Sequence, residues 1–204
     1  MEMPKVVDEE KRRERIAEAV WSIAAEQGLD RATIRAVAAE CDLSVGSIQH
    51  SFRTQEELKC FAMELVVQRV ITRLNAPREL PNHGSDKTIA IAELLMETLP
   101  LDAEREKEAR IWASFSTAAL TDEKLGAYSR QMNDALERFC LECMRELNAP
   151  KASEEDSDIR LKATHLHCLL DGLTVALLID PSTKRRQEAE RIVRNFVDQC
   201  ARGV

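Results

Sequence analysis

The sequence is poor in aromatic residues, which make up 4% of its 204 residues, and it lacks the marks of several protein classes. No apolar run approaches the roughly 20 residues that a membrane-spanning helix requires. The N-terminal stretch MEMPKVVDEEKRRER has no apolar signal-peptide core. A glycine-rich phosphate loop, an H-E-x-x-H motif and a nucleophile elbow are also missing. We therefore expect a cytoplasmic protein that is not an enzyme and needs no cofactor.

The composition also lacks an excess of positive charge. Asp and Glu number 36 against 29 Lys and Arg, which gives a net charge of −7. Binding to DNA of arbitrary sequence should therefore be weak, and any DNA recognition should depend more on contacts with bases. Hydrophobic residues at 44% and charged residues at 32% are typical of a globular protein. The few aromatics and the frequent Ala, Leu, Glu and Arg favour an all-α fold.

Apolar periodicity and capping residues predict about nine helices. Their approximate ranges are 8–27, 34–40, 45–51, 54–74, 87–99, 103–119, 122–147, 159–179 and 183–201. Residues 1–8 are expected to form a disordered arm, and the segments 75–86 and 148–158 a linker and a polar loop. We expect an N-terminal arm and helix-turn-helix domain over 1–55, a connecting helix over 56–74, and a second helical domain over 75–204.

The stretch from Thr33 to Phe52 (TIRAVAAECDLSVGSIQHSF) predicts two short helices joined by a tight turn. Thr33 and Ser44 are placed to cap these helices, because their side-chain oxygens can accept hydrogen bonds from free backbone N–H groups. Helices this short do not persist alone and need a third helix beneath them. A unit of this size is typical of proteins that place the second helix in a DNA major groove.

This segment resembles the DNA-binding segment of the TetR/AcrR family of transcriptional repressors. Nine positions are in register with the family pattern: Thr33, Val37, Ala38, Leu43, Ser44, Gly46, Ile48, Phe52 and Leu58. Gln49, Ser51 and Gln55 depart from it, since the family usually has two tyrosines and a lysine there, which mostly hold phosphates. The resemblance implies a double-stranded DNA partner and a long connecting helix between the DNA-reading part and the rest of the chain.

The residues expected to contact DNA form two groups. The second helix of the motif presents Val45, Gly46, Ser47, Gln49 and His50. The residues expected to hold phosphates are Thr33, Arg35, Ser44 and Arg53. Glutamine can pair with the N6 and N7 edge of adenine, and valine can contact a thymine methyl group. Positive charge is added at the start of the first helix by Lys11, Arg12, Arg13 and Arg15.

The second half of the chain also resembles a known group. The stretches EARIWASFSTAALTD and LLDGLTVALLIDP are similar to the C-terminal domain of BetI-type members of the family. The resemblance implies a homodimeric repressor that binds a palindromic operator and is released by a small-molecule effector. The aromatics available to line an effector cavity are Trp112, Phe115, Tyr128 and Phe139.

The segment from Leu166 to Ile179 is apolar almost all round, so it should bury more than one face. One face can meet the core of its own chain, and the other is expected to meet a second copy. The residues assigned to this dimer interface are Leu166, Leu169, Leu170, Leu173 and Leu177.

Two alternatives stay open. The six cysteines of a cytoplasmic chain are expected to be free thiols. However, the spacing of Cys140, Cys143, His165 and Cys168 would let two antiparallel helices bring four soft ligands together for zinc or a thiol switch. Cysteine as a small core residue is the simpler interpretation, and no metal is assigned. The other alternative is a helical adaptor that binds protein and not DNA.

Overall fold

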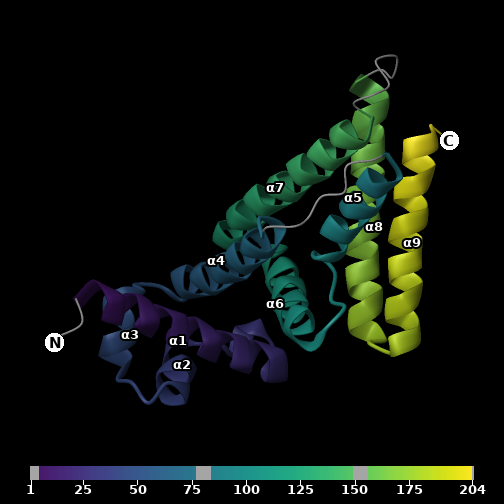
Figure 1. Cartoon of the computed structure of the whole chain (residues 1–204). Helices are drawn as coiled ribbons and strands as arrows, with labels where there is room; N and C mark the ends of the chain where they lie inside the picture. Colours follow the sequence, from purple (N-terminus) through teal and green to yellow (C-terminus); the bar gives the residue numbers. More distant parts are fainter. Residues whose placement is uncertain (1–4, 77–83, 149–155, 204) are drawn as a thin grey trace. The chain divides into compact units, whose positions relative to one another are not determined.

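The computed structural model describes residues 5–76, 84–148 and 156–203, and helices make up all the regular secondary structure in these ranges (Figure 1). The prediction of an all-α fold with about nine helices is confirmed. A short 3-10 helix, η1 (Leu29–Arg31), follows the first α-helix. The α-helices of the described residues are α1 (Lys5–Gln27), α2 (Ile34–Glu40), α3 (Val45–Ser51), α4 (Gln55–Leu74), α5 (Gly84–Met96), α6 (Ala103–Ala119), α7 (Glu123–Asn148), α8 (Asp156–Ile179) and α9 (Thr183–Arg202).

The predicted boundaries of α2, α3 and α6 agree with the structure, and others need correction. Because α1 begins at Lys5, a disordered arm is wrong for residues 5–8. α5 ends at Met96 and not at Leu99, because the N–H groups of residues 97–99 each donate to the carbonyl three residues earlier and form turns. Residues 1–4, most of the predicted linker (77–83) and most of the predicted polar loop (149–155) lie outside the described residues.

The chain forms two compact units whose limits differ from the predicted domains. The first unit comprises residues 1–71 and 110–129, and the second comprises residues 72–109 and 130–204. α4, α6 and α7 each contribute to both units. The second half of α6 and the start of α7, which the sequence assigns to the second domain, thus belong to the same unit as the helix-turn-helix.

The core of the first unit comes from α1, α2, α3 and α4. Its completely buried side chains include Ile16, Val20, Val37, Ile48 and Leu58. These residues follow the helical spacing that predicted the buried faces. α1 therefore supplies the third helix that the two short helices of the motif need.

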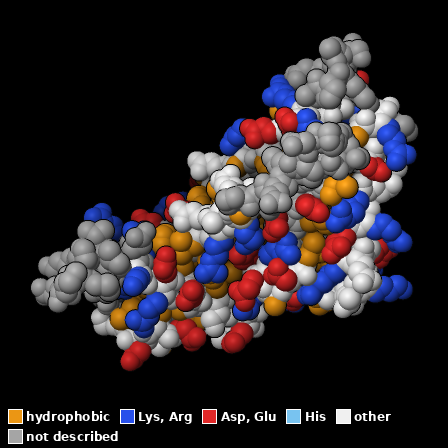
Figure 2. All heavy atoms as spheres, in the orientation of Figure 1, with side chains coloured by type: hydrophobic (Ala, Val, Ile, Leu, Met, Phe, Trp, Pro, Cys, Tyr) orange, Lys and Arg blue, Asp and Glu red, His pale blue; other side chains and the backbone are white. Residues whose placement is uncertain are grey.

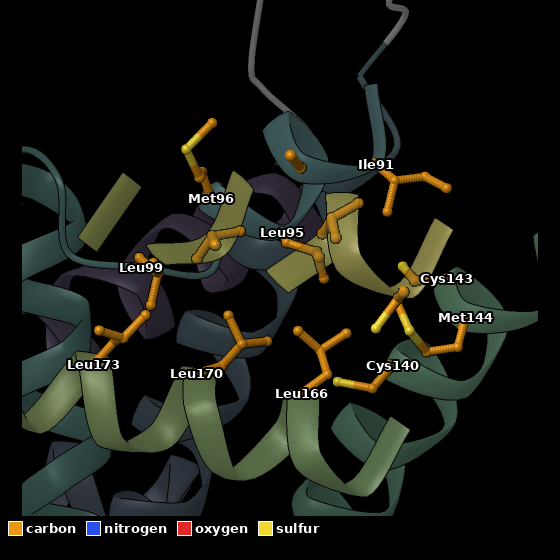
Figure 3. Packing of buried hydrophobic residues seen from close by; sticks show 14 of the residues in the cluster. Ile91, Leu95, Met96, Leu99, Cys140, Cys143, Met144, Leu166, Leu170 and Leu173 are labelled. Carbon is orange, nitrogen blue, oxygen red and sulfur yellow. The ribbon is translucent and has the colours of Figure 1, made fainter. Parts of the chain in front are cut away.

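The core of the second unit lies among α5, α7, α8 and α9. Figure 3 shows Leu166, Leu170 and Leu173 pointing from one face of α8 toward Leu95 and Leu99. Cys140 and Met144 of α7 belong to the same apolar cluster, as do Val193 and Val197 of α9. The exposed fractions of Leu166, Leu170 and Leu177 are 0%, 2% and 1%, so this face of α8 is fully used within one chain.

This burial corrects the assignment of the dimer-facing residues. Leu166, Leu170, Leu173 and Leu177 are buried in the core of their own chain, and Leu169 packs half-buried against it. The four buried leucines are therefore not available to a second copy. The reason is that α8 is apolar on several faces, so its periodicity does not identify the face that turns inward.

The other face of α8 is exposed in the single chain. Leu161, Val175 and Ile179 are 56%, 46% and 80% exposed. They form one stripe with three further exposed residues at helical spacing: His165, Cys168 and Gly172. The expectation that no segment approaches a membrane span is wrong for Ser157–Ile179, which is long and apolar enough by length and composition alone. This is weak evidence for a span, because a core helix of a soluble protein passes the same test.

Candidate nucleic-acid interface

The helix-turn-helix is held by the two caps that the sequence predicts. The Thr33 hydroxyl oxygen accepts a hydrogen bond from the Ala36 N–H at 3.1 Å, and the Ser44 hydroxyl oxygen accepts one from the Ser47 N–H at 3.1 Å. In the turn, Asp42 adopts a positive φ of 52°, a conformation that aspartate tolerates better than most residues. The Leu43 N–H donates to the Ala38 carbonyl at 2.8 Å, which closes the turn.

α4 is joined to this motif by a capping box and to α1 by side-chain contacts. The Thr54 hydroxyl accepts from the Glu57 N–H at 3.1 Å, and the Glu57 carboxylate accepts from the Arg53 N–H at 2.8 Å. The Trp21 indole of α1 donates to the Ala62 carbonyl of α4 at 2.9 Å. The motif is thus carried on the first part of α4 as one packed body.

The outer face of α3 carries most of the residues predicted to read bases. Gly46, Gln49 and His50 are exposed, and Val45 is 39% exposed. A Cβ atom added at Gly46 would meet nothing within 4 Å in the chain. Glycine inside a helix costs about 1 kcal/mol relative to alanine. Packing within the chain therefore does not require a glycine at position 46.

Among the residues of α3 predicted to read bases, Ser47 is the one that is half-buried and already accepts hydrogen bonds from another side chain. Arg12 of α1 donates through Nη2 to the Ser47 carbonyl oxygen at 2.6 Å and to its hydroxyl oxygen at 2.5 Å. Sequence reasoning noted Arg12 only as one charge in a basic cluster. No local signal marks the contact, since the two residues are 35 positions apart.

Four residues that flank the motif were predicted to hold phosphates, and the structure leaves two of them exposed. Arg35 and Arg53 are exposed, and Thr33 and Ser44 use their hydroxyl oxygens as helix caps. A capping hydroxyl still has its own O–H to donate to a phosphate. Acidic and basic side chains are interspersed over the face of the molecule seen in Figure 2, in keeping with the net charge of −7.

Arg13 is engaged inside the first unit and was also missed by sequence reasoning. Its guanidinium lies 4.5 Å from the ring centroid of Phe61 and 5.1 Å from that of Phe52. A cation over an aromatic face is stabilised by the ring quadrupole. Half of the N-terminal basic cluster, Arg12 and Arg13, thus helps to assemble the DNA-reading unit, while Lys11 and Arg15 are exposed.

The aromatic residues predicted to line an effector cavity are divided between the units. Phe115 is fully buried and lies edge-on to Tyr128, with ring centroids 5.7 Å apart. Burial, with the nearby Glu64 carboxylate, raises the pKa of Tyr128 to about 12. Trp112 is half-buried in the same unit. Phe139 belongs to the second unit, where it packs half-buried against the apolar core.

The second unit contains a polar pair on α8, a buried histidine beside a half-exposed aspartate, that the sequence did not single out. His167 is 9% exposed, and its Nε2 lies 3.6 Å from the Asp171 carboxylate. This Nε2 is buried and has no hydrogen-bond partner among the described residues. Burial raises the pKa of Asp171, and His167 opposes that rise. A buried nitrogen without a partner is costly, so this is a place where a bound polar group would be stabilising.

The predicted four-ligand group does not assemble. Cys140 and Cys143 are buried in the core of the second unit, whereas His165 and Cys168 are exposed on the outer stripe of α8. Within the described ranges, no three His, Cys, Asp or Glu side chains are grouped so that they could hold a metal ion. Burial raises the pKa of Cys140 and Cys143 to about 12, which keeps both thiols protonated at neutral pH.

Two family models match most of the chain. Residues 16–58 match the family described as bacterial regulatory proteins, tetR family, and residues 90–202 match the BetI-type transcriptional repressor C-terminal domain. The HTH-type transcriptional regulator PksA of Bacillus subtilis is 32% identical over 202 residues, covering 96% of this chain and 93% of PksA.

Solved structures agree with these matches. A transcriptional regulator from Rhodococcus has a TM-score of 0.79 at 25% identity, covering 94% of this chain and 96% of its own. A transcriptional regulator from Saccharomonospora viridis, solved in complex with choline, has a TM-score of 0.72 at 20% identity, with 93% and 96% coverage. At that identity the second likeness shows the fold alone.

Proposed function

Because the chain belongs to the TetR family of DNA-binding transcriptional regulators and ends in a BetI-type domain, we propose that it is a homodimeric cytoplasmic repressor. Each helix-turn-helix enters one major groove of a two-fold-symmetric operator, with the two centres about 34 Å apart or a multiple of that. A small molecule bound by the C-terminal part of the chain releases the DNA. Residues 1–55 read the operator, 56–74 connect, and 75–204 bind effector and partner.

The observation that carries this proposal is the outer face of α3. It combines exposed Gln49 and His50 with a glycine at position 46 whose missing side chain leaves open space. Asparagine and glutamine are suited to bidentate pairing with adenine, and a flat helix surface lets the backbone approach the groove. An adaptor that binds only protein would not need this combination.

The test is selection of binding sites from a random DNA pool by the purified full-length chain. We expect an enriched motif with two-fold symmetry. Gly46→Leu is the decisive variant, because a Cβ atom at this position meets nothing within 4 Å in the chain and leucine favours a helix more than glycine does. It should fold at least as stably as the wild type and lose DNA binding. If the wild type enriches no motif, or Gly46→Leu binds as well as the wild type, the proposal is wrong.

We propose that the second copy packs against the exposed stripe of α8, defined above by Leu161, His165, Cys168, Gly172, Val175 and Ile179. An exposed apolar stripe on an otherwise polar surface marks an interaction site. Ile192 of α9, which is 37% exposed, is a further candidate for the same interface. Exposure of Gly172 on this stripe would let two helices approach closely.

We propose two separate candidate sites for the effector, one within each unit. In the first unit these are Trp112, Phe115 and Tyr128. In the second they are Phe139 and the polar pair of His167 and Asp171, whose unpartnered Nε2 can bond a ligand. Aromatic faces and a carboxylate can both hold an organic cation, which makes choline a suitable first probe.

Calorimetry with choline tests this part of the proposal, using Asp171→Asn and Trp112→Ala beside the wild type. Phe115→Ala is a poorer choice, since emptying a fully buried aromatic site costs about 3–5 kcal/mol of stability. Operator DNA must weaken effector binding by the same factor by which effector weakens DNA binding. The coupling free energy between two such sites is typically about 1–3 kcal/mol. Equal choline affinity with and without operator would exclude choline as the inducer.

A further inference from the structure

Arg12 is the residue of α1 that is bonded to the DNA-reading helix α3. Its Nη2 donates to both the carbonyl oxygen and the hydroxyl oxygen of Ser47, at 2.6 and 2.5 Å. Both residues are half-buried. The Nε of Arg12 is buried without a hydrogen-bond partner in the part of the chain that the structure describes. The guanidinium is therefore turned toward Ser47 even though one of its own donors is left unpaired.

This contact restricts what the Ser47 hydroxyl can do. A serine hydroxyl has one donor and two lone pairs, and it normally rotates to suit its partners. Here a charged N–H is directed at the oxygen, and a charge-assisted bond of this kind is stronger than a neutral one. Because the guanidinium occupies a lone pair and repels the hydroxyl hydrogen, the O–H bond is turned away from Arg12 and is left to donate elsewhere.

We propose that Arg12 is a positioning residue for base readout; this inference rests on the proposed function as a DNA-binding regulator. Arg12 holds α3 against α1 through the Ser47 carbonyl and presents the Ser47 hydroxyl to DNA as a hydrogen-bond donor. In the major groove, guanine offers N7 and O6 as acceptors, adenine offers N7, and thymine offers O4, whereas cytosine offers an amino donor. Ser47 should therefore select against cytosine at the base that it faces.

The competing role for an arginine at this place is a direct phosphate contact. Such a contact carries no sequence information and steepens the dependence of affinity on salt. The two roles therefore predict different results. A positioning residue changes base preference at one place in each half-site, and a phosphate contact changes the affinity for all sequences alike.

The test compares Arg12→Ala, Ser47→Ala and the double variant of the full-length chain on the DNA motif that the wild type selects. We expect each single variant to lose about tenfold discrimination against cytosine at the same position of each half-site. The double variant should lose no more than either single variant, because both remove one shared interaction. Lys11→Ala is the matched control, since it removes a like charge from the same turn and should not change the base preference.

Several results would overturn the inference. Additive effects of the two single variants, or different affected positions, would show that Arg12 and Ser47 act separately. A uniform loss of affinity with a flatter salt dependence in Arg12→Ala would make Arg12 a phosphate contact. If Arg12→Ala is too unstable to study, Ser47→Ala must still lose the selection against cytosine. A wild-type chain that selects no DNA would contradict the proposed function itself and this inference with it.

Discussion

Gln49 is the exposed side chain of α3 whose chemistry is best suited to a single base. Its amide can donate to N7 and accept from N6 of adenine at once. Gln49→Ala should therefore lose about 1–3 kcal/mol of binding free energy on the selected operator and relax the preference at one position per half-site. Binding isotherms on the operator and on its single-base variants measure both effects. Unchanged affinity and preference would show that Gln49 does not read bases.

Arg53 provides the matched comparison, because it is exposed at the end of the same motif. Arg53→Ala should weaken binding to all sequences to a similar extent and reduce the slope of log affinity against log salt by about 1. A slope equal to that of the wild type would remove Arg53 from the phosphate contacts.

The thiols of Cys140 and Cys143 should be unreactive in the native protein. The thiolate is the nucleophile, and a pKa of about 12 leaves almost none of it at pH 8. We expect iodoacetamide at pH 8 to leave both residues unmodified in native protein and to modify both in guanidinium chloride, as read by peptide mass spectrometry. Native labelling at the unfolded rate would revive the thiol-switch hypothesis for this pair.

Individual residues were predictable where their role is local. The caps at Thr33 and Ser44 and the box of Thr54 and Glu57 depend on partners three or four positions away, so sequence spacing identifies them. The Arg12–Ser47 contact joins residues 35 positions apart and depends on how α1 lies against α3. Local patterns contain no information of that kind.

At the scale of elements, a partly buried ion pair joins the C-terminal end of α4 to α6. Arg73 donates from Nη1 and Nη2 to the two carboxylate oxygens of Glu108, at 3.0 and 2.6 Å. The Glu108 side chain is 7% exposed and that of Arg73 is 28% exposed. α6 is tied in turn to α9, where Arg186 donates to Glu106 at 3.0 Å. Within the second unit, α6 is thus tied both to the C-terminal end of α4 and to α9.

Glu108→Ala should lower the free energy of unfolding by about 1–3 kcal/mol, because Arg73 loses its closest partner and keeps the more distant Glu97 carboxylate at 3.9 Å. Glu104→Ala is the control on the same helix. It breaks an ion pair in which the Glu104 side chain is 71% exposed and the Lys107 side chain is 66% exposed. The loss of stability should be no more than about 0.5 kcal/mol. Urea unfolding of both variants measures the difference. Equal losses would show that the α4–α6 pair does not hold the two helices together.

Helices were predicted well where a side-chain cap marks their first turn. The end of α5, predicted from Pro100, was wrong by three residues. α2, α3 and α6 have the predicted limits, since Thr33 and Ser44 cap the first two and Asp102 accepts from the Arg105 N–H at the start of the third. In α8 the helix itself was predicted correctly. Its inward face was not, because leucines occur around most of its circumference.

For the whole molecule, apolar periodicity and capping residues predicted the number of helices, and the family resemblance predicted the DNA-reading end. The division into units depends on packing. Residues 110–129 belong to the first unit, although no domain boundary was predicted near them. Which face of α8 is free for a partner also depends on the core of the second unit. The assembly can therefore be tested with substitutions that the sequence alone would not have suggested.

Val175→Arg and Ile179→Arg should convert the proposed dimer to a monomer. Both side chains are exposed in the single chain, at 46% and 80%, so arginine costs little to the fold. In a dimer it would bury an unpaired charge at the interface. By contrast, arginine at Leu170 or Leu177, each no more than 2% exposed, should unfold the second unit instead of separating two intact copies. Light scattering together with thermal unfolding distinguishes these outcomes.

Leu120→Arg is the control, because Leu120 is an exposed leucine, 84% accessible, at the end of α6 and away from the α8 stripe in sequence. It should stay dimeric. The α8 variants should also lose operator affinity. A monomer binds one half-site only, whereas the second subunit of a dimer is already held beside its half-site and binds it at little further cost. Cys168, on the same stripe, should become more reactive toward iodoacetamide in the monomers. Folded α8 variants that remain dimeric, with Cys168 as protected as in the wild type, would place the interface elsewhere.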